Sequence, residues 1–240
     1  MNNEADFESY FYLSTNKLII TVFEKNNKKN IFNDEAVLKD NDNNKDDDEI
    51  IDYLEIENFL EKNIFKIEKI TKTFLNEVYL IIDHQDSLPI NISLKYNNEG
   101  NLLKKRNVDY LLKDAKQQIN RYYLDRSAAH IIINNYILDK VNYSYLPENL
   151  SCDNFSLEIK FICFSKKIIK EIEDIFHKQH IFINKVICAK YAKEFFNYEK
   201  IDICEMALNI CEGCNKKEVI LIPKIEEKKG FFERFFNLFG

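Results

Sequence analysis

Glycine, proline and tryptophan are scarce in this sequence. Its 240 residues include four Gly, three Pro and no Trp. Fibrous and collagen-like proteins need far more glycine and proline, so these classes are excluded. The length is enough to bury a sizeable core, in one large domain or two small ones.

Long apolar runs and a signal peptide are also missing. A helix that spans a bilayer needs about 20 apolar residues, and no stretch approaches this length. The opening residues, MNNEADFESY, carry acidic groups and no apolar run after a basic segment. We therefore expect a protein of the cytosol, unless another feature attaches it to a membrane.

An excess of positive charge is absent. The chain has 34 Lys and Arg against 40 Asp and Glu, which gives a formal net charge of −6. Nucleic-acid binding depends strongly on cations that contact phosphates, so a general nucleic-acid role has no electrostatic support. We expect no nucleic acid among the partners.

The cysteines give no sign of a disulfide framework. Six are present, and in a cytosolic chain they are most simply reduced thiols, with Cys163 and Cys188 inside apolar strand-like runs. Cys211 and Cys214 have the spacing of half a zinc site or of a redox pair, but a second such pair is missing. The nearby side chains that would have to complete a site are Cys204, His177 and His180. We expect no metal, and interpret the stretch as a loop with two thiols.

Hydrophobic periodicity predicts a mixture of strands and helices. Residues 11–23 predict a β-hairpin with Leu18, Ile20 and Val22 on one face. Apolar residues at three- and four-residue steps predict helices over 55–74 and 108–119, the second capped by Asn107. The other expected elements are strands at 78–82, 89–96, 128–134, 136–141, 155–164, 181–188 and 219–223, helices at 168–175 after the cap Ser165 and at 204–211, and a solvated loop at 40–49. This order fits an α+β or mixed α/β fold with one subdomain inserted into another.

The end of the chain has a strongly amphipathic pattern. At about 100° per residue, an arc of about 160° collects the apolar side chains Phe231, Phe232, Phe235, Phe236, Leu238 and Phe239. Polar side chains fill the other side, and Lys228 and Lys229 lie just upstream, which suits anionic headgroups. An isolated helix this short is marginal in water, so it should fold on its target surface. We predict an amphipathic membrane-targeting helix over 231–240 rather than ordinary core.

Isolated titratable residues carry little signal. His130 lies in an apolar strand, where a histidine is more often a satisfied core or edge residue than a catalyst. His84 follows a strand and lies in an expected linker. Neighbouring carboxylates, such as those of 46–49 or of Glu171 and Asp174, stand no higher than the background of an acidic chain. We therefore predict no catalytic residue.

Residues 129–139, AHIIINNYILD, are similar to the motif "LHxxPxxYxxD". This and several other local motifs resemble FtsA, the actin-like bacterial division protein that tethers the tubulin-like FtsZ polymer to the membrane. Residues 147–151, PENLS, resemble "PxGxSG", and residues 157–162, LEIKFI, resemble "LExxxHII". Residues 107–116 and 168–192 resemble the flanking helix and the return to the main body, and the tail resembles the family's membrane-targeting helix. The resemblance covers nearly the whole chain.

Two departures from the family bear on activity. Actin-fold ATPases open with a D-x-G-[ST] turn that approaches phosphate and helps to place the metal. Aligned on Lys17, this chain has Tyr12 in place of the Asp and Ser14 in place of the Gly. After residue 192 the chain is also too short for the second lobe and its "DxGGGT" loop. We therefore expect no cofactor and no enzymatic activity, with Ser14, Thr15 and Lys17 as a degenerate phosphate turn.

The resemblance implies a partial actin-like (RNase H-like) lobe with an inserted SHS2-type subdomain, also called 1C. The implied units are 8–83 with 165–223 for the lobe, 84–164 for the insertion, 224–230 for a linker and 231–240 for the membrane helix. The implied function is that of a non-enzymatic adaptor of the division machinery at the inner face of the cell membrane. Its expected partners are the membrane surface, FtsA- or FtsZ-type or later division proteins, and other copies of the chain. The alternatives are an unorthodox actin-like ATPase, in which Ser14, Thr15 and Lys17 still contact phosphate, and an actin-fold platform protein of pilus or secretion assembly.

Overall fold

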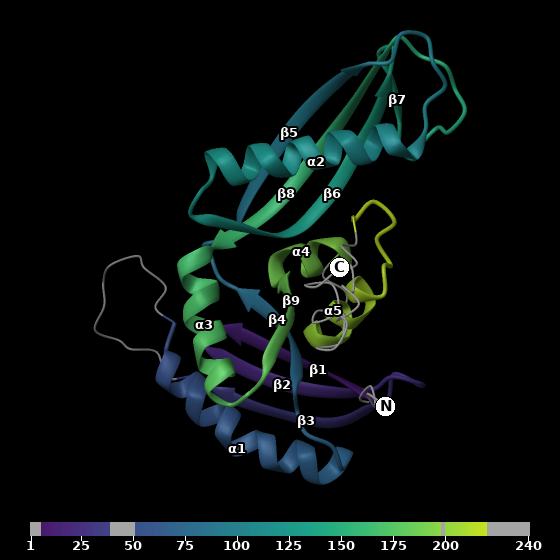
Figure 1. Ribbon diagram of the computed structural model, residues 1–240. Coiled ribbons are helices and arrows are strands. Elements are labelled where there is room, and N and C mark those ends of the chain that lie inside the picture. Colours follow the sequence, from purple (N-terminus) through teal and green to yellow (C-terminus); the bar gives the residue numbers. More distant parts are fainter. Residues whose placement is uncertain (1–5, 39–50, 198–199, 220–240) are drawn as a thin grey trace, which may run out of the picture.

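The structure is a computed structural model that describes residues 6–38, 51–197 and 200–219. Two β-sheets organise this part of the chain (Figure 1). The strands of the first sheet are β1 (Phe7–Ser14), β2 (Lys17–Glu24), β3 (Asn30–Val37), β4 (Glu77–Asp83) and β9 (Phe182–Cys188). Those of the second are β5 (Leu88–Asn97), β6 (Arg126–Leu138), β7 (Val141–Tyr143) and β8 (Asn154–Ser165). The described helices are α1 (Tyr53–Thr71), α2 (Lys105–Tyr122), α3 (Lys166–Lys178), α4 (Ala189–Phe195) and α5 (Ile203–Cys211).

The first sheet is mixed, with the strand order β3-β2-β1-β4-β9. β1, β4 and β9 are parallel, whereas β2 is antiparallel to both of its neighbours. β1 and β2 form a hairpin in which Leu13 lies opposite Leu18. The hairpin predicted over 11–23 is therefore confirmed, although both strands extend slightly beyond that range.

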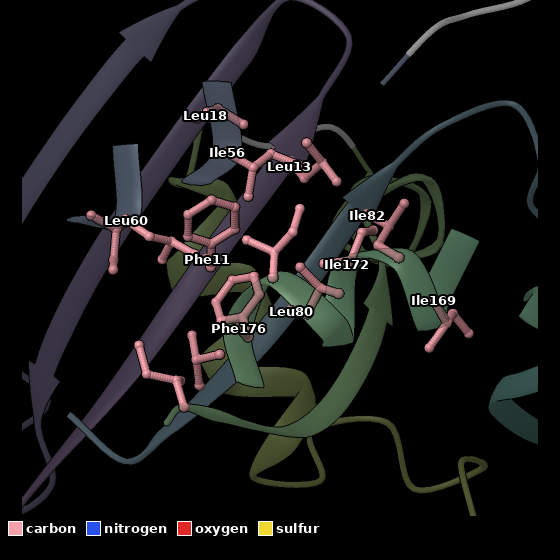
Figure 2. Close-up of a cluster of buried hydrophobic side chains, with 14 of the residues drawn as sticks. Phe11, Leu13, Leu18, Ile56, Leu60, Leu80, Ile82, Ile169, Ile172 and Phe176 are labelled. Carbon is pink, nitrogen blue, oxygen red and sulfur yellow. The ribbon is translucent and has the colours of Figure 1, made fainter. Parts of the chain in front are cut away.

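Alternation along the strands of the first sheet gives it two apolar faces. On one face, Phe11 and Leu13 of β1 and Leu80 of β4 pack with α1 and α3 (Figure 2). The Phe11 ring makes edge contacts with Phe59 of α1 and Phe176 of α3, at centroid distances of 5.9 and 5.1 Å. Burial of these large side chains is the main source of stability for this half of the molecule.

The other face of the first sheet is covered by α5, next to α4. Tyr10 and Tyr12 alternate with Phe11 and Leu13 on β1, so their rings lie on this opposite face, where they pack in one cluster with Cys204 of α5. The Tyr10 ring stacks on Tyr79 of β4 at 4.8 Å. Helices on both faces thus bury most of the strands β1, β2 and β4, which matches their largely apolar sequences.

The second sheet is antiparallel, with the order β5-β8-β6-β7 and α2 across one face. It lies between β4 and α3 in the sequence, so the chain leaves the first sheet after β4 and returns through β8 (Figure 1). Asp86 and Ser165 mark these two passages, and an Asp86 carboxylate oxygen accepts the Ser165 backbone N–H at 2.6 Å. The two passages are therefore held side by side.

Two predictions for the second sheet and its helix α2 are wrong: the division of one strand and the cap of the helix. The strands expected at 128–134 and 136–141 are one strand, β6, which continues through irregularities before His130 and before Asn135. It ends at a tight turn in which Asp139 and Lys140 have φ of 44° and 75°. Asn107 is not the cap of α2: the helix begins at Lys105, and the Asn107 side chain instead accepts the backbone N–H of Lys104 at 3.0 Å.

Besides the three-residue strand β7, two elements escaped prediction. β3 is a partly exposed edge strand whose four apolar residues form two adjacent pairs, so it lacks the alternation expected of a strand. α4 has seven residues, too few for a clear helical period. By contrast, the cap predicted at Ser165 is confirmed, because its Oγ accepts the Lys167 backbone N–H at 3.2 Å.

Candidate functional site

The candidate site lies where β1 and β4 end and β2 begins. Ligands of parallel α/β sheets bind outside the carboxyl ends of the strands. Ser14 ends β1 and is in register with Asp83, which ends β4. The short turn to β2 contains Thr15 and Asn16, and its Asn16 carbonyl accepts the Leu38 backbone N–H at 2.8 Å. The predicted phosphate turn therefore lies at the expected edge of the sheet.

The Ser14 hydroxyl is fully engaged within its own turn. Its oxygen accepts the Lys17 backbone N–H at 3.0 Å, and its hydrogen lies within reach of Asn16 Oδ1 at 2.9 Å and of the Lys17 carbonyl at 3.0 Å. The Lys17 ammonium points elsewhere and pairs with Glu35 of β3 at 2.7 Å. Neither polar group is directed at a shared vacant position.

Asp83 provides the carboxylate at this edge of the sheet. Its Oδ2 accepts the Tyr12 hydroxyl at 2.7 Å and pairs with the Lys193 ammonium of α4 at 2.6 Å. The same ammonium lies 5.9 Å from the centroid of the Tyr12 ring. Burial and the hydrogen bond to Asp83 raise the pKa of the Tyr12 phenol, which keeps it protonated and a donor.

In this arrangement the Asp83 carboxylate is paired within the protein, and no group of the described residues here is directed to bind a phosphate. Tyr12 fills the position that the family gives to a carboxylate, and Lys193 neutralises the carboxylate that remains. A divalent cation at Asp83 would have to displace that ammonium. Within the described residues, no group of three or more His, Cys, Asp or Glu side chains is placed to hold a metal ion.

Asp83 and Lys193 were not predicted as site residues. Asp83 had a readable signal, because it directly follows a buried strand, at the edge where parallel sheets bind ligands. Lys193 had none, since it belongs to the short helix α4 that the pattern did not reveal.

A second polar cluster, which also escaped prediction, is centred on the buried Glu218. Its carboxylate oxygens lie 2.8 Å from His130 Nδ1, 3.1 Å from Lys185 Nζ and 2.9 Å from the Tyr191 hydroxyl. These partners come from β6, β9 and α4, so Glu218 joins both sheets to the segment that follows α5. Backbone hydrogen bonds from Ile133 to Lys217 and from Val219 to Ile131 extend the same contact.

His130 is a satisfied core residue, as predicted. Its Nε2 accepts the Cys188 backbone N–H at 2.8 Å, so the ring proton lies on Nδ1 and is donated to Glu218. Burial lowers the pKa of His130, although Glu218 opposes this shift. Burial would raise the pKa of Glu218, but the hydrogen bond from His130, with the Lys185 charge and the Tyr191 hydroxyl, lowers it overall.

A polar hollow of about 360 Å³ lies at the passage between the two sheets, lined by residues 84–88 and Arg126. Its two charged groups are paired with each other, since Arg126 Nη1 lies 2.7 Å from Asp86 Oδ1. His84 Nδ1 accepts the Asp86 backbone N–H at 3.0 Å. These contacts stabilise the passage between the sheets and present no nucleophile.

The thiols at the end of α5 are held in the protonated form near neutral pH. Burial raises the pKa of Cys211 to about 12 and also raises that of the exposed Cys214. Cys204 is buried against the first sheet, with its pKa likewise raised to about 12 by burial. Reactive and ligating cysteines need a lowered pKa, because the thiolate is the active form.

The predicted membrane-binding residues fall outside the part of the chain that the structure describes. These are Phe231, Phe232, Phe235, Phe236, Leu238, Phe239, Lys228 and Lys229. The same holds for the acidic loop at 40–49 and for nearly all of the strand expected at 219–223. Of the described helices, none combines the length and the apolar character needed to cross a membrane.

No protein-family model matches the sequence, and no curated protein matches it. Solved structures do resemble the fold. A PilM-PilN type IV pilus biogenesis complex aligns with a TM-score of 0.47 and 6% identity, over 80% of this chain and 49% of that one. The cytoplasmic domain of EpsL, an inner membrane component of the type II secretion system of Vibrio cholerae, aligns with a TM-score of 0.35 and 11% identity, over 78% and 57%.

A Bacteroides thetaiotaomicron protein with an actin-like ATPase fold and unknown function aligns with a TM-score of 0.28 and 12% identity, over 80% of this chain and 56% of that one. This chain thus spans about half the length of each solved chain. The fold class is mixed α/β, as the sequence predicted, and the partial actin-like lobe stays a prediction. The FtsA-like identity is a finer statement, and it stays a prediction.

Proposed function

We propose that this chain is a non-enzymatic adaptor that holds other proteins at a membrane surface and serves the bacterial division machinery. The observation that carries the non-enzymatic part is that Ser14, Lys17 and Asp83 at the candidate site are bound by other groups of the protein. Ser14 is bound within its turn, Lys17 by Glu35, and Asp83 by both Tyr12 and Lys193. A nucleotide would have to break these contacts before it gained any of its own.

The adaptor part is supported by the way helices cover the two sheets. Helices cover both faces of the first sheet. The second sheet has a helix on one face only, and its long strands extend away from the first sheet. An inserted unit of this kind offers surface for partners without a role in a nucleotide cleft. The resemblance of the tail to a membrane-targeting helix supplies the membrane side of the proposal.

Thermal denaturation with and without Mg-ATP tests the loss of the nucleotide site. A ligand that binds the folded state raises its stability by RT ln(1 + [L]/Kd). We expect no shift in Tm at millimolar Mg-ATP, with Mg²⁺ alone as the control for ionic effects. A clear rise that depends on the nucleotide would overturn the non-enzymatic proposal and favour the unorthodox ATPase.

Co-sedimentation with vesicles tests the membrane side. The intact chain and a chain that ends at Lys229 are mixed with vesicles of phosphatidylcholine containing phosphatidylglycerol. We expect the intact chain to pellet and the shortened chain to lose most of its binding, because the phenylalanines provide the apolar insertion. Equal pelleting of both, or pelleting of neither, would show that the tail is no anchor.

Localisation of a fluorescent fusion separates division from the alternative of pilus or secretion assembly. Division predicts a band at midcell, which becomes diffuse when the chain ends at Lys229. Foci at other assembly sites on the envelope would instead favour a platform protein of a pilus or secretion system.

A further inference from the structure

We propose that the outer face of α2 is a second membrane-contact surface, which binds anionic lipid headgroups alongside the tail. The proposal rests on the membrane-associated function above. It assigns to the inserted unit an orientation in which α2, rather than the open face of the second sheet, lies against the bilayer.

The positions of the cations on α2 define this surface. The buried side of the helix is formed by Val108, Leu111, Leu112, Ala115 and Ile119. At about 100° per residue, five cations fall in an arc of about 160° on the opposite side. They are Lys105, Arg106, Lys113, Lys116 and Arg121, all exposed except the half-buried Lys116. A single acid, Asp109, shares the arc, so the face is strongly cationic in a chain whose net charge is −6.

None of these five cations forms an ion pair with any residue in the described ranges, although the Arg121 guanidinium lies over the Tyr122 ring. Lys62 and Lys66 of α1, by contrast, both pair with Asp34 of β3. Figure 1 shows α2 across the strands of the second sheet, with no other described element over its outer side. The charge of α2 is thus free for an external anion.

Exposed aromatic side chains accompany the charge. Tyr110 lies within the arc and is 60% exposed. Tyr122 ends the helix at an angle outside the arc, is 69% exposed, and has the Arg121 guanidinium 5.5 Å from its ring centroid. Tyrosine is enriched at the headgroup level of membranes, where an apolar ring with a polar tip is well solvated. A cationic face that contains Tyr110 matches an anionic bilayer surface.

The path of the chain favours a membrane over other polyanions. Val219, the last described residue, packs against the core beneath α2 and is hydrogen-bonded to β6. Residues 220–230 precede the phenylalanine arc, and an extended chain of this length reaches about 36 Å. α2 itself is about 27 Å long. The tail therefore starts from the unit that carries α2, and can insert into a bilayer that α2 faces.

Matched charge variants of the full chain test the proposal. The α2 variant replaces Arg106, Lys113 and Lys116 with Gln, which removes three charges and preserves helix propensity. The control replaces Lys69, Lys72 and Lys170 with Gln; these residues are exposed on or beside α1 and α3 and change the net charge equally. Each cation near an anionic bilayer contributes about fivefold in affinity. We expect the α2 variant to bind phosphatidylglycerol vesicles more than tenfold more weakly at low salt, and the control to change less than threefold.

The four chains together distinguish the possible failures. If the chain that ends at Lys229 binds weakly but the α2 variant binds like the intact chain, the tail anchors the protein and the α2 proposal is wrong. If the α2 variant and the control lose binding equally, only net charge matters and the proposal is again wrong. If the α2 variant keeps vesicle binding but loses binding to an RNA duplex, the surface fits a nucleic acid instead. If the intact chain does not bind vesicles, the membrane function fails and this proposal fails with it.

Unchanged Tm values for the α2 variant and the control verify that both remain folded. A weaker dependence of vesicle binding on salt in the α2 variant gives a second readout, because fewer cations then contact the bilayer. Equal salt dependence in the intact chain and the α2 variant would contradict the proposal.

Discussion

At the scale of single residues, buried polar atoms differ in how well they are satisfied. Thr21 and Ser9 are both 1% exposed on the first sheet. The Thr21 hydroxyl donates to Asn33 Oδ1 at 2.8 Å, whereas Ser9 Oγ has no hydrogen-bond partner among the described residues. A buried hydroxyl without a partner keeps its desolvation cost, so the two residues should respond oppositely to loss of the hydroxyl.

Replacing Ser9 with Ala should raise the free energy of unfolding by about 1 kcal/mol, because it removes an unpaired buried hydroxyl. The matched substitution Thr21→Val should lower it by about 1 kcal/mol, because a hydrogen bond is lost. Urea denaturation measures both values. A loss of stability in Ser9→Ala would mean that this hydroxyl has a partner.

The Glu218 carboxylate should contribute far more than a surface ion pair. Its side chain is 3% exposed, and its removal leaves His130 and Lys185 without their partner. We expect Glu218→Ala to cost about 3 kcal/mol in the free energy of unfolding. Glu212→Ala, which breaks the exposed pair with Lys28, should cost less than about 1 kcal/mol. Similar costs for the two variants would show that the buried cluster is not specially stabilising.

At the scale of elements, the β6–β7 turn carries a local cost. Asp139 and Lys140 both have positive φ, as in the tight turns that favour Asn or Asp followed by Gly. Asp139 suits its position, since its carboxylate accepts the backbone N–H groups of Asp153 and Asn154 at 3.1 and 2.8 Å. Lys140 gains no such compensation, and a side chain in this region of φ is strained.

Replacing Lys140 with Gly should therefore stabilise the protein by up to about 1 kcal/mol, because glycine removes the strain at positive φ. Asp139→Gly should instead destabilise it, since the two hydrogen bonds to the β7–β8 connection are lost. Thermal denaturation of both variants measures the difference. A lower Tm for Lys140→Gly would indicate that the lysine side chain makes a compensating contact.

At the scale of the whole molecule, the His130–Glu218 cluster, which connects both sheets, makes the free energy of unfolding depend on pH. The folded state lowers the pKa of His130, so the unfolded chain binds more protons below about pH 6.5 and stability falls as the pH decreases. The pKa of Glu218 is lowered too, so its stabilisation is complete above about pH 4.5 and is lost as the pH falls through its folded pKa. Both shifts have the same sign.

We therefore expect the free energy of unfolding to decrease between pH 7.5 and pH 5, by at most about 1.4 kcal/mol per pH unit for His130 below pH 6.5. Urea midpoints at pH 7.5, 6 and 5 measure this slope. His130→Asn should be less stable at pH 7.5 but should show a shallower slope. If the variant keeps the full slope, the pH dependence arises elsewhere.

Sequence alone determined the parts of this protein that depend on local pattern. Leu18, Ile20 and Val22 placed the hairpin, the helical spacing of apolar residues placed α1, and Ser165 capped α3, because burial and capping act through neighbours along the chain. The resemblance to the FtsA family, rather than local pattern, identified Tyr12 and Ser14 as departures from a phosphate turn. The fold class followed from these elements and from the resemblance.

Tertiary structure alone decided which distant groups meet. Glu218 and His130 are 88 residues apart, and Lys193 and Asp83 are 110 apart. No periodicity encodes such pairs, because they depend on how the first sheet, the inserted sheet and the short helix α4 pack together. β3 was missed because its four apolar residues form two adjacent pairs, 31–32 and 36–37, instead of alternating, and its pairing with β2 is visible only in the fold. The sequence thus placed the departures from a phosphate turn at Tyr12 and Ser14, and packing decided what lies beside them: the Asp83 carboxylate, which accepts the Tyr12 hydroxyl and pairs with the Lys193 ammonium.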